Sequence, residues 1–184
     1  LALPLEQAHQ LLGTIEPGEP ELRGLLALMG MASSSSCLTI GALYPLDTPD
    51  PGFDVMHPSL DSPIALISHD SSKREQPSYR ALVIQGRTRW SRANLEESKH
   101  SWGGSLLAAA AATLGDWVKE PLVRYEHRWR FARIDGAPAF RSPVLTAVHG
   151  ATLAVTGEGF SDGGGVQGAF TSGLDLADRL LEAL

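Results

Sequence analysis

Residues 151–184, ATLAVTGEGFSDGGGVQGAFTSGLDLADRLLEAL, decide the fold of this end of the chain. Ala151, Leu153 and Val155 alternate with polar or small residues, which predicts a short strand. A glycine-rich turn follows this strand. From Val166 onward, apolar residues recur every three or four positions, and this spacing predicts a long helix with one apolar face.

A strand, a glycine-rich turn and a helix N-terminus together bring backbone N–H groups to a place where they can contact an anion or a polarised carbonyl. Glycines permit a close approach because no Cβ separates the backbone from a ligand. Glu158 adds a carboxylate that can accept hydrogen bonds from sugar-type hydroxyls. We therefore expect a cofactor-binding segment; the alternative is a glycine-rich connection that binds nothing.

The segment 122–132, upstream of this region, has the alternation of a strand. One face carries Tyr125, His127, Trp129 and Phe131, and the other carries Arg124, Glu126, Arg128 and Arg130. We predict that the aromatic face turns inward, toward the core or a cavity, with Arg128 and Arg130 outward.

The remaining patterns predict an α+β fold, with a mixed, largely antiparallel β-sheet and flanking helices. We expect the runs 64–69 and 79–85 to pair as antiparallel strands. A further helix is expected to start at Ser91 or Asn94, with Glu97 completing a capping box. The glycine pair 103–104 is expected to interrupt this helix. An alanine-rich helix is then expected to continue over 105–114 and to stop at Gly115. The other expected elements are helices at 5–12 and 21–31, a strand at 37–43, a long loop or a hairpin at 45–63, and a loop at 136–143.

Composition and charge narrow the class of protein. A chain of 184 residues suits one domain, or one domain and a fragment of another. The net charge of -6 argues against nucleic acid or an anionic membrane as a partner. The single cysteine, Cys37, excludes an internal disulfide and favours a reducing, cytoplasmic compartment. Because the sequence does not begin with methionine, we expect a fragment or a processed product.

Several familiar sites are not indicated. The six histidines lack the paired spacing of metal ligands, so no metal site is expected. A Gly-x-Ser-x-Gly nucleophile motif is missing, which argues against a serine hydrolase. His69 and Asp70 are neighbours on a strand and point to opposite faces, and Lys73 suits a solvated turn better than an anion site. His127 is the best catalytic candidate, and its alternative is a structural histidine.

Several stretches together resemble the renalase-like flavoproteins, a flavin-containing amine oxidase-like family. They occur in the family's order over nearly the whole chain, although no single motif decides the matter. These stretches are the strand 37–43, Asp70-Ser71-Ser72-Lys73, Trp90-Ser91 with Leu95-Glu96-Glu97, His127-Arg128-Trp129-Arg130-Phe131-Ala132, and Gly168-Ala169-Phe170-Thr171-Ser172-Gly173.

The resemblance implies an FAD-dependent oxidoreductase with a p-hydroxybenzoate-hydroxylase-like architecture. No Gly-x-Gly-x-x-Gly motif follows a strand, so the unit that holds the ADP pyrophosphate is missing from this sequence. We therefore expect residues 1–150 to be the substrate-binding domain. Residues 151–184 are expected to be the last strand, turn and helix of an FAD-binding domain.

By the same resemblance, His127 and Trp129 are the expected catalytic residues on the substrate side. The expected cofactor-binding residues are Gly157, Glu158, Gly159, Phe160, Gly165, Val166, Gln167 and Gly168. Glu158 stands where the wider flavoprotein pattern has aspartate after glycine. The implied reaction is oxidation of a reduced nicotinamide-like or amine substrate by hydride transfer to flavin, which oxygen then reoxidises.

The alternative is a non-catalytic binding or interaction module that keeps the substrate-domain fold without flavin. The expected partners are a small-molecule substrate and either the missing N-terminal half or a second copy of the chain. No nucleic acid and no membrane are expected as partners. Without the missing half, we expect residues 151–184 to be poorly supported, with an open strand edge and an exposed apolar helix face.

Overall fold

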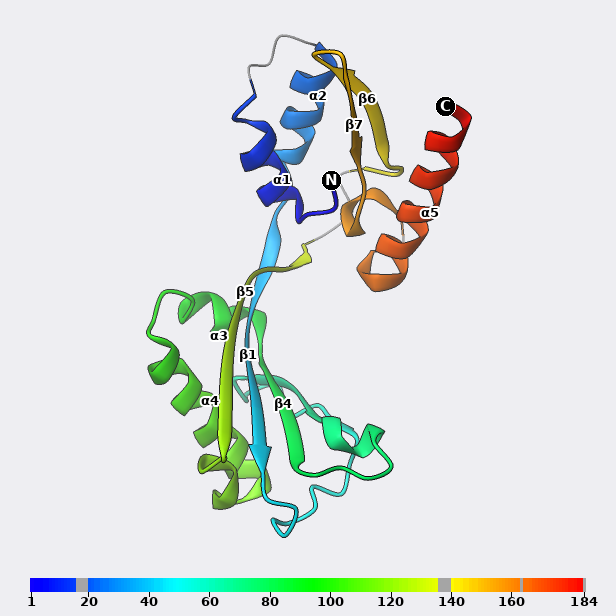
Figure 1. The fold of residues 1–184 in the computed structure, drawn as a ribbon. Coiled ribbons are helices and arrows are strands. Elements are labelled where there is room, and N and C mark those ends of the chain that lie inside the picture. Colours follow the sequence, from blue (N-terminus) through cyan, green and yellow to red (C-terminus); the bar gives the residue numbers. More distant parts are fainter. Residues whose placement is uncertain (16–19, 136–139, 163, 184) are drawn as a thin grey trace. The chain divides into compact units, whose positions relative to one another are not determined.

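The computed structural model describes residues 1–15, 20–135, 140–162 and 164–183 (Figure 1). The chain forms two compact units, Leu1–Ser35 with Phe131–Leu184, and Ser36–Arg130. We call them the terminal unit and the central unit. The helices are α1 (Leu5–Leu12), α2 (Pro20–Met29), α3 (Thr88–Ala93), α4 (Lys99–Leu114) and α5 (Gly165–Ala183). The strands are β1 (Ser34–Tyr44), β2 (Val55–Met56), β3 (Ile64–His69), β4 (Arg80–Gly86), β5 (Val123–Ile134), β6 (Val144–Val148) and β7 (Ala151–Val155), and short 3-10 turns are η1 (Asp70–Lys73), η2 (Asp116–Lys119) and η3 (Glu158–Phe160).

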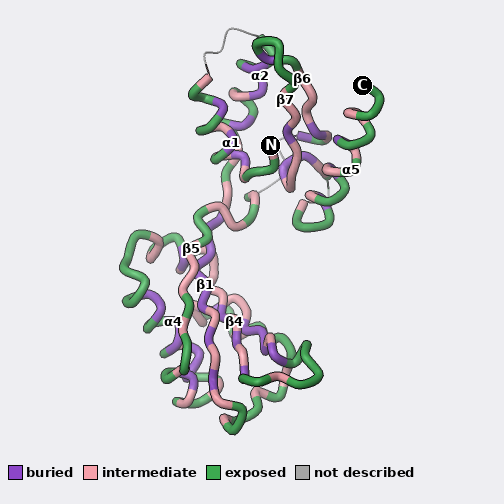
Figure 2. Tube along the Cα trace, in the orientation of Figure 1, coloured by how far each residue is buried: buried purple, intermediate pink, exposed green. Residues whose placement is uncertain are grey.

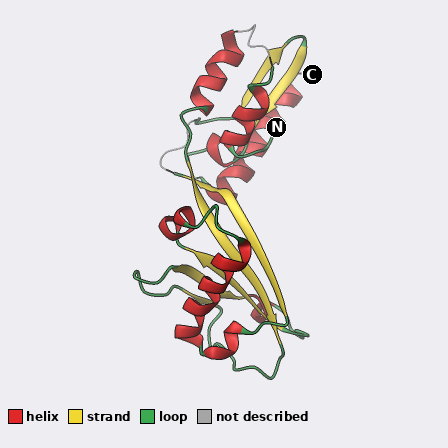
Figure 3. Cartoon of the chain, turned by 90° about the vertical axis from the view of Figure 1, so that its left-hand side faces the viewer, coloured by secondary structure: helices red, strands yellow, loops and turns green. Residues whose placement is uncertain are grey.

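The central unit is built on a five-stranded sheet in the order β2-β3-β4-β1-β5. The β1–β4, β2–β3 and β3–β4 pairs are antiparallel, which confirms the α+β class and the pairing expected for β3 and β4. Helix α4 covers one face of this sheet (Figure 3). The core between them includes Leu38, Ile40 and Tyr44 of β1 and Trp102 and Leu106 of α4.

Two expectations about helix α4 were wrong: the residue at which it starts, and its interruption at the glycine pair 103–104. Its N-cap is Ser98, whose Oγ accepts a hydrogen bond of 3.2 Å from the Ser101 N–H. The helix continues through Gly103 and Gly104 without a break. Gly103 faces β5 so closely that a Cβ there would lie 2.9 Å from Arg124 Nη2, and this packing offsets the low helix propensity of glycine. Gly115, with a φ of 99°, ends the helix as expected.

The two neighbouring glycines of α4 are expected to respond oppositely to alanine. Gly104 is exposed and has nothing within 4 Å of an added Cβ, so Gly104→Ala should raise the free energy of unfolding. The expected gain is about 0.5–1 kcal/mol. Gly103→Ala should not raise the free energy of unfolding, because the added Cβ displaces Arg124 and crowds Glu126. Urea unfolding of both variants measures the difference, and equal stabilisation by the two alanines would contradict the packing described here.

The terminal unit packs α1 and α2 against the antiparallel β6–β7 hairpin. Strand β6 was not expected from the sequence, and residues 136–139 of the expected loop lie outside the described residues. Val155 and Phe160 are fully buried with Leu5 and Met29, and the ring centroids of Phe140 and Phe160 lie 4.6 Å apart. The expectation that residues 151–184 are poorly supported is therefore wrong for the packing of the strand and the turn. The expected open strand edge is confirmed among the described residues, because β7 pairs only with β6 in a two-stranded sheet.

The exposed apolar face expected on the last helix is confirmed. Val166, Phe170, Leu174 and Leu181 of α5 have exposed fractions of 90%, 67%, 54% and 72%. Figure 2 shows α5 as a largely exposed helix. Only Gly168, Ser172 and Leu176 are buried among its described residues. Within the described ranges, no helix is both long enough and apolar enough to cross a bilayer.

Candidate functional site

The turn between β7 and α5 has a backbone that requires glycine at three positions. Gly157, Gly164 and Gly165 have φ values of 142°, 56° and 61°, which side chains with a Cβ rarely adopt. No heavy atom lies within 4 Å of a Cβ added at any of the three, so the space beside the backbone is open. The turn therefore has the conformation and the open approach that a cofactor-binding segment needs.

Ser172 fastens this turn to α5, a role that sequence reasoning missed. Its side chain is 2% exposed, and its Oγ lies 2.8 Å from Thr156 Oγ1 and accepts a hydrogen bond of 3.1 Å from the Gly157 N–H. The Gly157 carbonyl, 2.9 Å away, can accept the serine proton. The only signal in the sequence is a small hydroxyl residue among the glycines of 168–173.

Ser172→Ala is expected to lower the free energy of unfolding by about 1 kcal/mol, because it removes hydrogen-bond partners from partly buried polar groups of Thr156 and Gly157. The matched control is Thr171→Ala, since Thr171 is exposed and its hydroxyl donates only to Gln167 O within its own helix. Chemical denaturation of both variants tests this role. Equal stabilities for the two would show that Ser172 does not fasten the turn.

Two hollows flank the turn. The first, with a volume of about 430 Å³, is lined by Gly157, Glu158 and Gly159 together with Ala169 and Gly173 of α5 and Phe131 and Arg133 of β5. The second, of about 440 Å³, is lined by Phe160, Gln167 and Gly168 together with Ser161 and Arg141. Both volumes are in the range of small-molecule sites. Of the expected cofactor-binding residues, Gly165 and Val166 line neither hollow.

Glu158 has a role that the sequence did not predict. Its Oε1 accepts a hydrogen bond of 3.1 Å from the Gly165 N–H, at the first residue of α5. A carboxylate at this position stabilises the positive end of the helix. Its other oxygen, Oε2, makes no hydrogen bond with a described residue, and is free to accept one from a hydroxyl.

Two further groups bear on whether the turn fits a flavin. The Ser161 hydroxyl is buried and has no hydrogen-bond partner among the described residues. The N–H of Val166 lies in the first turn of α5, where backbone N–H groups have no acceptor within the helix itself. A buried hydroxyl and the N–H groups of a helix N-terminus beside open glycines suit the polar edge of a flavin, so the residues present fit the expected cofactor.

Strand β5 alternates as predicted, but its aromatic face does not turn inward. Tyr125 and Trp129 are 62% and 51% exposed. The face toward α4 carries Arg124 and Glu126, which form an ion pair over Gly103. The inward orientation of the aromatic face was therefore wrong, because the alternation of a strand fixes which residues share a face but not which face is covered. The stems of charged side chains cover α4 instead.

The aromatic residues of β5 form a stripe, which we define as Tyr125, His127 and Trp129. The ring centroids of His127 and Trp129 lie 4.2 Å apart, and those of Tyr125 and His127 lie 6.1 Å apart. The Tyr125 hydroxyl lies 3.3 Å from His127 Nδ1. Because this contact uses Nδ1, the Nε2 atom of His127 is the nitrogen available to a ligand.

The opposite face of β5 is held by ionic contacts. Arg130 Nη1 donates to Glu96 Oε1 at 2.6 Å, and Arg128 Nη2 donates to the Glu97 carbonyl at 2.7 Å. The hydrogen bond from Arg130 holds the pKa of Glu96 below its usual range. These contacts link β5 to the segment between α3 and α4 and fix the stripe on the sheet face opposite α4.

The expected site residues divide between the two compact units. His127 and Trp129 belong to the central unit, and Gly157 to Gly168 belong to the terminal unit. The expected domain boundary at residue 150 remains a prediction, because it concerns an expected longer protein with an FAD-binding domain rather than the packing of this chain. Among the described residues, no group of histidine, cysteine and acidic side chains is placed to hold a metal ion.

Solved structures with a similar fold are oxidases. A putrescine oxidase with bound putrescine matches 98% of the chain with a TM-score of 0.71 and 21% identity. Cyclohexylamine oxidase from Brevibacterium oxydans IH-35A matches 100% of the chain with a TM-score of 0.66 and 17% identity. A protein assigned as a protoporphyrinogen oxidase from Exiguobacterium sp. 255-15 matches 99% with a TM-score of 0.69 and 17% identity.

No protein-family model matches the chain. The chain spans about two fifths of the length of the similar structures, with 42%, 42% and 40% of the three covered. At these identities the likeness concerns the fold: nearly the whole chain folds like one portion of these oxidases.

Proposed function

We propose that residues 1–184 are part of an FAD-dependent oxidoreductase of renalase-like type. The proposed reaction oxidises a reduced nicotinamide-like or amine substrate by hydride transfer to the flavin, with reoxidation by oxygen. The observation that carries the proposal is the turn 157–165, whose open glycine backbone lies beside the first turn of α5. The likeness of the fold to that of amine oxidases supports the same class.

The turn would hold the flavin through its backbone. The open sides of Gly157 and Gly165 allow contact with a planar ring, and the Val166 N–H can donate to a carbonyl or anionic edge. Glu158 Oε2 can accept a hydrogen bond from the ribityl chain while Oε1 stays on the Gly165 N–H. Bound FAD supplies the two-electron redox chemistry, and the protein positions and tunes it.

The aromatic stripe would contact the substrate. The stripe is exposed on the sheet face opposite α4. The Trp129 and His127 rings are therefore open to a planar or apolar ligand. His127 Nε2 can exchange a hydrogen bond with a polar substituent, while Tyr125 orients the ring through Nδ1. A dihydronicotinamide ring offers both a flat face and a carboxamide, which favours this substrate class over a simple alkylamine.

A single-turnover experiment tests the proposed reaction. FAD-loaded protein is mixed without oxygen with a dihydronicotinamide, and separately with putrescine, and the absorbance of oxidised flavin is followed. We expect the dihydronicotinamide to bleach the flavin, and hydrogen peroxide to form when air is admitted. Flavin that stays oxidised with both compounds would overturn the proposed reaction.

A non-catalytic binding module is the second candidate. The observation that favours it is the Glu158 carboxylate, which already caps α5 where a cofactor anion is expected. Under this proposal the exposed apolar residues of α5 bind the missing N-terminal half or a second copy of the chain. Persistent failure of the protein to retain flavin, together with stable complex formation, would support this candidate.

A further inference from the structure

The central unit contains a polar hollow of about 560 Å³ that the proposed function does not use. It lies where β3 ends and β4 begins, between the loop 46–54 and the turn η1. Its walls include Leu46, Phe53 and Pro77, and its polar groups come from Asp50, Asp54, His69, Ser71, Ser72, Arg74 and Arg80. All of these residues belong to the central unit.

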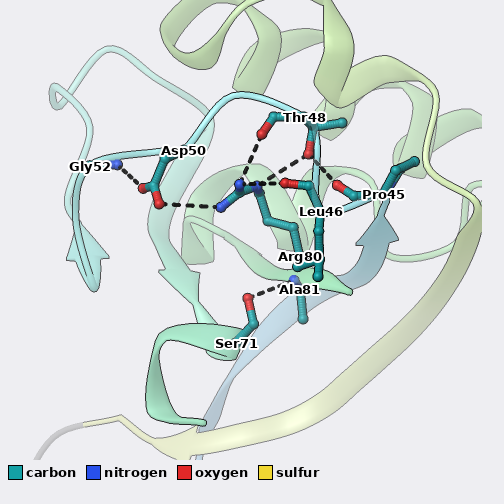
Figure 4. A network of polar contacts seen from close by, with 8 residues as sticks. All are labelled: Pro45, Leu46, Thr48, Asp50, Gly52, Ser71, Arg80 and Ala81. Carbon is teal, nitrogen blue, oxygen red and sulfur yellow. Dashed lines mark hydrogen bonds and ion pairs between the residues drawn. The ribbon is translucent and has the colours of Figure 1, made fainter. Parts of the chain in front are cut away.

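Arg80 is the buried cation of this hollow. Its side chain is 10% exposed, and its guanidinium donates to Leu46 O at 3.0 Å, to Thr48 O at 2.8 Å and to Thr48 Oγ1 at 3.2 Å (Figure 4). These bonds hold the guanidinium in place. The contact from Nη1 to Asp50 Oδ2 is longer, at 3.4 Å, and the second N–H of Nη1 has no partner among the described residues.

His69 and Ser71 add two more donors beside Arg80. His69 pairs with Leu82 across β3 and β4, which places its side chain on the same face as Arg80, one diagonal step away. It is 8% exposed, lines the hollow, and its ring makes no hydrogen bond with a described residue. Ser71 is 3% exposed; its Oγ accepts the Ala81 N–H at 3.0 Å and keeps its own proton to donate.

The charges around the hollow differ in their exposure. The Asp50 side chain is 69% exposed, whereas that of Arg80 is 10% exposed. Asp54, the other carboxylate of the lining, is also exposed. Water screens exposed carboxylates far more than a buried guanidinium, so Arg80 is the least screened charge at the floor of the hollow. Asp50 keeps its charge, because the hydrogen bond from the Gly52 N–H and the nearby charges of Arg80 and His69 lower its pKa. The charged Asp50 carboxylate therefore occupies the place where an anionic ligand could contact Arg80. Its contact with Arg80 is also the longest that the guanidinium makes.

We propose that this hollow binds a small oxyanion, a carboxylate or a phosphate, through Arg80, His69 and Ser71, and that the ligand displaces the Asp50 carboxylate. The ligand's oxygens accept from the free Nη1 donor, the imidazole and the serine hydroxyl. Charge-assisted hydrogen bonds of this kind are the strong class of polar contact. The apolar wall of Leu46, Phe53 and Pro77 leaves room for a short carbon chain on the ligand.

An NMR titration of the complete 184-residue chain tests this site without any flavin, so its outcome is independent of the proposed oxidoreductase. Sodium phosphate and sodium acetate are added separately, with sodium chloride at equal ionic strength as the reference. The amide signals of Gly52 and Ala81 report on binding, because these N–H groups donate hydrogen bonds to the Asp50 and Ser71 side chains. Saturable shifts with phosphate alone or acetate alone identify which oxyanion the site takes.

Matched variants separate this site from general surface charge. Asp50→Asn keeps an acceptor for the Gly52 N–H but removes the competing charge, so it is expected to bind about tenfold tighter. His69→Gln is expected to bind about tenfold more weakly. Lys99→Gln, an exposed change at the start of α4, should leave the affinity unchanged. Absence of saturable shifts with both salts, equal shifts with chloride, or an Asp50→Asn chain that binds no tighter than the wild type would overturn the proposal.

Discussion

Gly168→Leu is expected to release FAD from the complete flavoprotein. Gly168 is buried in the first turn of α5, its N–H donates to Gly164 O at 3.0 Å, and it lines the hollow of about 440 Å³. A leucine there crowds the backbone of the proposed flavin site. Extra methylenes in a packed site cost about 1–3 kcal/mol, so we expect FAD affinity to fall by about tenfold or more.

Retained flavin after gel filtration measures this effect, and thermal unfolding shows whether the variant is still folded. Ala177→Leu is the matched control, since it adds the same side chain to an exposed position of α5. Gly168→Ala should fall between the wild type and Gly168→Leu. If the folded Gly168→Leu variant retains as much flavin as the wild type, α5 is not part of the cofactor site.

His127→Ala is expected to leave FAD bound but to slow the reduction of the flavin by substrate. His127 belongs to the exposed stripe, and the turn 157–165 does not depend on it for any described contact. Loss of a side chain that positions the substrate against the flavin slows a reaction by about 100-fold. Stopped-flow bleaching of oxidised flavin under anaerobic conditions measures the rate directly.

Two variants on the same strand provide the controls. Tyr125→Phe removes the hydroxyl at Nδ1 but keeps both rings, so it should slow reduction less than His127→Ala. Arg130→Gln changes the opposite face, which pairs with Glu96, and should leave the rate near that of the wild type. Normal reduction in His127→Ala would place the substrate elsewhere.

Much of the fold follows from local patterns in the sequence. The alternation in 64–69 and 79–85 predicts β3 and β4, and Gly115 predicts the end of α4. These features depend on residues that are close in sequence. Strand β6 was missed because Val144–Val148 is short and needs β7 beside it to form.

The errors concern features that distant residues decide. Gly103 continues a helix because Arg124, twenty-one positions later, packs on it. The exposed face of β5 was misassigned because the ion pair of Arg124 and Glu126, and not the aromatic rings, covers α4. Neither contact leaves a periodic trace in the sequence.

The candidate site was predicted in part. The glycines of 157–165 indicate an open backbone, and the positive φ values confirm that conformation. The cap that Glu158 forms on Gly165 and the contacts of Ser172 depend on the exact path of the turn. Sequence reasoning identifies residue types, whereas these hydrogen bonds require coordinates.

The absorption spectrum of the purified protein tests the central claim most directly. The sample should contain residues 1–184 together with any polypeptide that its gene encodes beyond them, and FAD should be supplied during purification. Our account predicts the visible absorption band of oxidised flavin, at about one FAD for each copy of the turn 157–165. A colourless protein that takes up no FAD would contradict it.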